Sequence, residues 1–126
     1  MNKPARTLMA AVAAVVITAA AASAHHGWSW AEEEQSELTG TVVSLVVAPP
    51  HPSLEVEAED GMWKIELGNP RQTQRAGFDD TSASKGDKVV ILGNRSLDRN
   101  EKRMKAVRIT VEGKAYDIYP ERIEAD

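Results

Sequence analysis

The chain has 126 residues, no cysteine and a formal net charge of −4. Without cysteine it has no disulfide, no thiolate metal site and no thiol nucleophile, so a bound metal would need histidine, carboxylate, methionine or backbone ligands. The acidic balance disfavours a phosphate backbone as partner, and we expect no nucleic-acid binding.

The first 24 residues have the three parts of a secretion signal. Lys3 and Arg6 precede an apolar run over 8–22, and Ala22-Ser23-Ala24 forms a small-residue cleavage box. The run is too short and too rich in alanine to span a bilayer of roughly 30 Å. We therefore predict a cleaved signal peptide at 1–24, export to the periplasm or the outside, and no membrane span after cleavage.

Residues 25–37 are polar and include three consecutive glutamates, which predicts an exposed N-terminal arm. Trp28 and Trp30 are spaced for one face of an extended segment, so we expect them to pack the arm onto the domain. A β-rich run at 38–47 follows and predicts a long first strand with a bend at Gly40. Three prolines at 49–52 then predict a rigid loop that presents His51.

Alternating apolar and charged residues on both sides of Asp60-Gly61 predict a β-hairpin over 54–67. Asn69-Pro70 and Gly77 bracket a short helix. Strands are predicted at 88–93, 106–111 and 116–119, with a charged, solvated loop at 94–103.

The predicted order of a long strand, a hairpin, a short helix and further strands is that of an OB-fold. We predict an all-β protein with one short helix, a small OB-like barrel of five to six strands over 38–119, and a C-terminal tail at 120–126. A small β-sandwich is the alternative, because five or six short strands do not fix closure.

The three histidines lie at the expected new N-terminus (His25, His26) and at the tip of the proline loop (His51). Cleavage after Ala24 would give His25 a free amine beside its imidazole, and cleavage one residue earlier would place a histidine third in the chain. Either start supplies nitrogen ligands suited to Cu(II), which nitrogen sites hold more tightly than other divalent first-row metals. The other interpretation is that the pair marks a soluble cleavage junction and that His51 is merely solvated.

No Gly-x-Ser-x-Gly or His-Glu-x-x-His pattern occurs, so we predict a protein that is not an enzyme. The sharpest hypothesis is a monomeric exported protein that binds copper through His25, His26 and His51, with Glu33 or Glu34 as a carboxylate partner. The alternative is a metal-free envelope module that binds a small ligand or a protein at the face between loops 48–53 and 94–103.

These residues resemble a family of small exported bacterial proteins of unknown function, in which the signal peptide ends in His-His and a Pro-His loop follows a Gly-Thr-Val strand. The resemblance implies an OB-like β domain in the periplasm and supplies no activity. The family loop reads Asn-Pro-His, whereas this chain has Pro49-Pro50-His51. The resemblance rests on these segments: Ala24-His25-His26, Gly40-Thr41-Val42, Pro50-His51, Trp63 with Glu66, Asn69-Pro70, Arg75-Ala76-Gly77, Lys85-Gly86-Asp87 and the strand around Val107.

Overall fold

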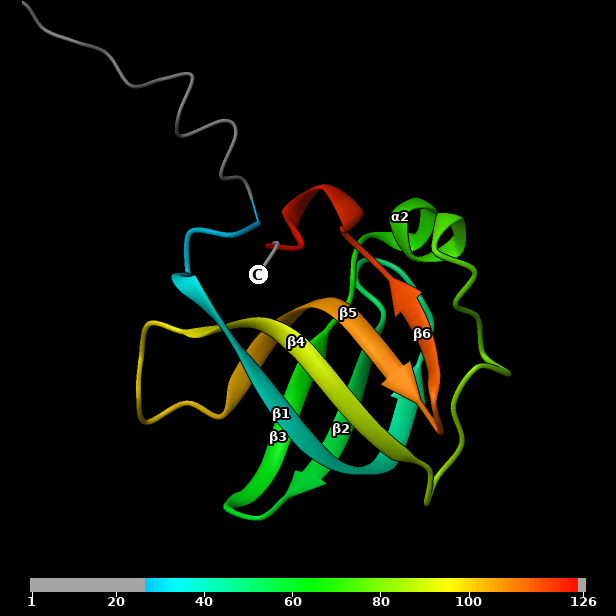
Figure 1. Cartoon of the computed structure of the whole chain (residues 1–126), viewed down its shortest axis with the longest axis horizontal. Helices are drawn as coiled ribbons and strands as arrows, with labels where there is room; N and C mark the ends of the chain where they lie inside the picture. The colour runs from blue at the N-terminus through cyan, green and yellow to red at the C-terminus, as the bar shows by residue number, and fades with distance from the viewer. Residues whose placement is uncertain (1–26, 125–126) are drawn as a thin grey trace, which may run out of the picture.

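The computed structural model describes residues 27–124, so the expected signal peptide at 1–24, His25 and His26 lie outside the described residues. Figure 1 shows strands wound around a common centre, with one short helix at one end. The elements are β1 (Ala31–Val46), β2 (Ser53–Ala58), β3 (Gly61–Glu66), α2 (Pro70–Arg75), β4 (Lys88–Ser96), β5 (Arg103–Val111), β6 (Lys114–Asp117) and a 3-10 turn, η1 (Pro120–Arg122).

Five of the strands form a closed ring. The sheet order is β3-β2-β1-β4-β5-β6, all antiparallel, and a parallel pairing of β3 with β5 joins the two ends of the first five strands. β6 pairs only with β5 and lies outside the ring. This arrangement confirms the predicted all-β, OB-like class with its single short helix.

β1 is longer than the sequence pattern indicated. Residues 31–37, expected in the exposed arm, form its first half and pair with β4, from Ala31 opposite Ser96 onward. The side-chain amide of Asn94 donates to the carbonyl oxygens of Glu32 and Glu33 and so holds this half in place. The glutamates at 32–34 lie in an irregularity of the pairing between Ala31 and Gln35, where the Asn94 side chain takes the place of ladder hydrogen bonds to two of their carbonyls. The arm prediction is therefore corrected for 31–37.

The second half of β1 pairs with β2, and a bulge between Val42 and Ser44 bends the strand between its two partners. Gly40 lies where β1 passes from β4 to β2. A Cβ at this position would collide with the backbone oxygen of Glu57 and the side chain of Val56. Gly40 thus allows the close approach of β2, whereas the irregularity of the strand lies between Val42 and Ser44 and not at Gly40 itself.

The hairpin and the helix agree with their sequence signals. β2 and β3 pair from Ser53 opposite Glu66 to Ala58 opposite Gly61. α2 begins after Asn69, whose side chain accepts a hydrogen bond from the Gln72 amide at 2.8 Å. The side-chain amide of Gln72 donates to the Ile118 carbonyl at 2.8 Å, which fixes the helix to the end of β6.

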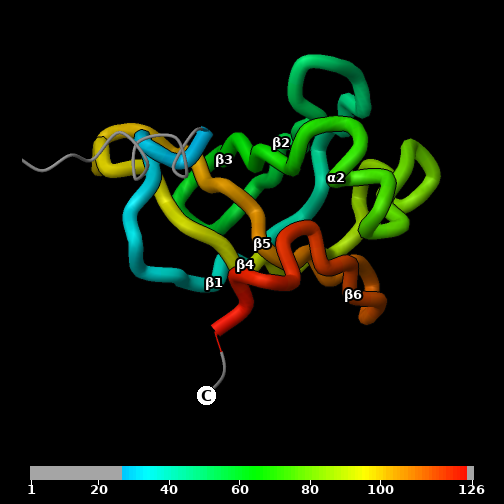
Figure 2. Tube along the Cα trace, turned by 90° about the horizontal axis from the view of Figure 1, so that it is seen from above, coloured from blue at the N-terminus to red at the C-terminus, as the bar shows by residue number. Residues whose placement is uncertain are grey.

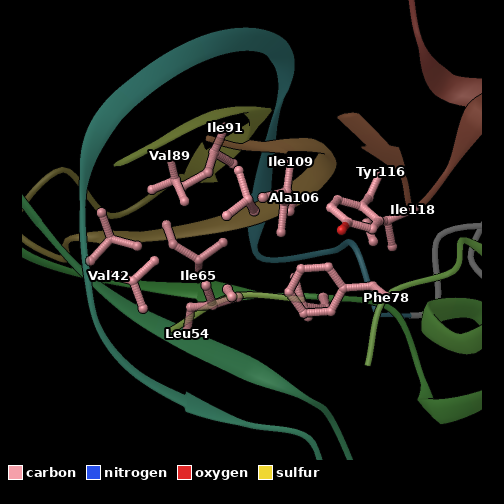
Figure 3. Close-up of a cluster of buried hydrophobic side chains, with 14 of the residues drawn as sticks. Val42, Leu54, Ile65, Phe78, Val89, Ile91, Ala106, Ile109, Tyr116 and Ile118 are labelled. Atoms are coloured by element: carbon pink, nitrogen blue, oxygen red, sulfur yellow. The ribbon is translucent and has the colours of Figure 1, made fainter. Parts of the chain in front are cut away.

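The core fills the ring and continues under α2. Figure 3 shows Leu54, Ile65, Ile91 and Ile109 meeting inside the strands, with Phe78 packing at the end near the helix. The rings of Phe78 and Tyr116 meet edge to face, with centroids 5.2 Å apart. Trp63, Phe78 and Tyr116 are buried.

Candidate functional site: a charged hollow over the β3–β5 junction

A hollow of about 390 Å³ lies on the outer face of the ring where β3 meets β5. The parallel register sets Lys64 beside Arg103 and Glu66 beside Lys105. Ile65 between them turns inward and is fully buried. Because strand side chains alternate, four charged residues share the outer face. The hollow is lined by Gly27, Trp30, Pro50, His51, Ser53, Lys64, Glu66, Arg103 and Lys105.

The segment before β1 covers this face. In Figure 2 the beginning of the described chain runs beside the loop that joins β4 to β5. The Leu97 amide donates to the Trp30 carbonyl at 2.8 Å. The Arg103 guanidinium lies 3.6 Å from the centre of the Trp30 ring. The Trp28 ring meets Tyr119 edge to face at 5.0 Å, so both tryptophans pack this segment onto the domain as expected.

Arg103 and Glu66 form the best-defined ion pair of the hollow. The Nε and Nη2 atoms of Arg103 both lie 2.6 Å from Oε2 of Glu66. The Glu66 side chain is 8% exposed, so the pair is shielded from solvent. Trp30 covers the guanidinium and Glu66 neutralises it, which leaves Arg103 largely compensated.

Lys105 has no such compensation. It is 3% exposed, yet no hydrogen bond or ion pair joins its ammonium group to another described residue. Its Nζ lies 5.5 Å from the Trp28 ring centre and 5.8 Å from that of Tyr119. Burial lowers the pKa of Lys105 below its usual value, and the charge of Glu66 only partly opposes this effect.

The C-terminal turn packs against Trp28, and Trp28 and Arg122 line a second hollow rather than this one. Arg122 in η1 lies 3.9 Å from the Trp28 ring centre, and its carbonyl accepts a hydrogen bond from Gln35 at 2.6 Å. Burial also raises the pKa of Tyr119. Residues 120–122, expected in a tail, therefore pack against the start of the described chain.

Of the predicted histidine ligands, only His51 lies within the described residues, and it is exposed at the edge of the hollow. Gly27, the residue after His26, lines the same hollow. Glu33 lines a different hollow and Glu34 lines neither of the two. Within 27–124, no three histidine, cysteine or acidic side chains group closely enough to hold a metal.

Sequence reasoning missed Lys64, Arg103 and Lys105. Arg103 was assigned to a solvated loop, but it begins β5, and the described loop is limited to 97–102. A usable signal existed, because Arg103 and Lys105 alternate with Met104 and Ala106 as the outer and inner faces of a strand do. The spacing of Trp28 and Trp30 predicted that the covering segment packs onto the domain, but nothing in the local sequence indicated that it would cover Lys105.

A family model for a family of unknown function, DUF6152, matches residues 12–105, and the chain belongs to this family. This confirms the expected membership of a family without assigned function. A comparison with curated proteins gave no match.

Several solved structures are similar in fold at low sequence identity. The S. pombe Stn1-Ten1 complex aligns with a TM-score of 0.51 at 14% identity, over 61% of this chain and 57% of that one. A ZRD-deleted mutant of TiaS in complex with agmatine aligns with a TM-score of 0.53 at 15% identity, over 68% and 26%. This chain thus spans a part of each matched protein, and the likeness concerns the fold alone. Across 27–124, no helix has the length and apolar character needed to cross a membrane.

Proposed function

We propose that this protein is exported to the periplasm or the outside, is not an enzyme, and binds copper through His25, His26 and His51. The observation that supports the proposal is that Gly27 and His51 line one hollow. His26 directly precedes Gly27, and consecutive α-carbons are about 3.8 Å apart. We propose that the His26 imidazole joins His51 on one ion.

The positive charges that line the hollow influence which metal ions it can bind. Lys64 and Lys105 repel any cation near them, so a weakly coordinated ion gains little from this surface. Copper is the divalent first-row ion that nitrogen ligands bind most tightly. The amine freed by signal cleavage and the three imidazoles make such a nitrogen set, which favours copper over calcium, magnesium or zinc.

The test is a Cu(II) titration of the exported, processed protein, whose first residue is established by mass spectrometry. We expect tight one-to-one binding to the wild type and at least about tenfold weaker binding to His26→Ala and to His51→Ala, since each removes a ligand. Electron paramagnetic resonance would count the nitrogen ligands of the bound ion. Asn100→Ala, at an exposed loop position away from the hollow, is the control and should bind copper as the wild type does.

Two other outcomes would contradict the shared site. Loss of binding in His26→Ala alone would mean a simple chelate at the chain terminus without His51. Binding no stronger than that of free histidine would exclude the copper function and favour the metal-free envelope module.

A further inference from the structure

The hollow beside His51 is lined by Lys105, whose ammonium group has no hydrogen-bond or ion-pair partner among residues 27–124. Transfer of an ammonium group from water into a protein is costly unless an opposite charge or hydrogen bonds compensate it. Lys105 is 3% exposed, and the one buried carboxylate beside it, Glu66, is held by Arg103 at 2.6 Å. Contacts with the Trp28 and Tyr119 rings at 5.5 and 5.8 Å compensate only part of this cost.

The surrounding residues fit a small organic anion. Lys64 adds a second positive charge at the hollow, and its strand neighbour Arg103 is already paired. Trp30 and Pro50 add apolar surface to the lining. A volume of about 390 Å³ is within the range of sites that bind metabolite-sized molecules.

We propose that this hollow binds a small organic carboxylate, with Lys105 as the buried anchor and Lys64 as a second contact at the surface. The carboxylate supplies a hydrogen-bonded ion-pair partner, which no described residue provides to Lys105. The site uses only described residues and needs no metal, so it does not require the proposed copper function, although His51 lines the same hollow.

The experiment is a calorimetric titration of the processed protein, stripped of metal by a chelator that is then removed by dialysis. Benzoate and citrate are the carboxylate probes, and inorganic phosphate is the comparison. We expect one-to-one binding of a carboxylate, weakened about tenfold or more in Lys105→Met, because a hydrogen-bonded charge pair is lost. A smaller loss, about threefold, is expected in Lys64→Met, because an exposed charge pair contributes less.

Lys102→Met is the matched control, since Lys102 is exposed beside the hollow without lining it. It should leave the affinity unchanged. Equal affinity of the wild type and Lys105→Met would overturn the proposal. So would binding of phosphate but of neither carboxylate, because the ligand class would then be different. No copper is present in this titration. The result for the carboxylate therefore holds whether or not the histidines bind a metal.

Discussion

The six paired residues of the β3–β5 junction are divided between an inner and an outer face that differ in character. Inside, Ile65 and Met104 are fully buried among other apolar side chains. Outside, the neighbours of Ile65 and Met104 in the chain are charged, and Lys105 is 3% exposed as a residue but has no ion-pair partner in the described part of the chain. The inner face stabilises the ring, whereas the outer face retains an unfavourable charge. Such a charge indicates a role in binding, since stability alone would favour an apolar residue.

The largest effect is expected from the inner face. Ile65→Ala removes a fully buried side chain and leaves a cavity in the ring, which should lower the free energy of unfolding by about 3 kcal/mol. Urea denaturation followed by tryptophan fluorescence would measure it. Met62→Ala, on the exposed side of the same strand, is the control and should stay within about 0.5 kcal/mol. Similar losses in the two variants would mean that the inner face does not dominate stability.

On the outer face we expect a substitution to raise the free energy of unfolding rather than to lower it. Lys105→Met keeps the length and apolar stem of the side chain and removes the buried charge, so the free energy of unfolding should rise by about 1 kcal/mol. For a domain of this size Tm should rise by about 5 °C, which differential scanning calorimetry would detect. A lower Tm than the wild type would show that the ammonium group stabilises the fold, and would remove the reason to expect an anionic ligand.

The stability gain of Lys105→Met should also depend on pH, and this effect is smaller. The pKa of Lys105 is lower in the folded state than its usual value of 10.5, so the charged form is the one that folding disfavours. The free-energy cost of burying the charged ammonium group is complete at pH values below the pKa of the folded state. This cost decreases as the pH rises from that pKa toward 10.5, and it is absent above 10.5. The Tm advantage of Lys105→Met should therefore shrink across that alkaline window. An advantage that stays constant or grows would contradict the assigned cause.

The sequence predicts much of the ring and little of the outer site. Asp60-Gly61 and Asn69-Pro70 have local signals, and the hairpin and helix form where those signals place them. The pairing of 31–37 with β4 depends on residues such as Asn94 that are distant in the chain, so composition alone suggested an arm. Lys105 is buried by Trp28 and Tyr119, which come from opposite ends of the described chain, and no local pattern predicts that contact.

The position of the hollow also determines when it can exist during folding. Glu66 and Arg103 are separated by 37 positions in the chain, whereas the contact between Ser44 and Glu55 spans 11. Closing a longer loop loses more chain entropy, so distant pairings form late and slow the folding of β proteins. A chain that has formed only its hairpin has no junction of β3 with β5 and hence no hollow. Ligand binding at Lys105 is thereby restricted to molecules that have completed folding.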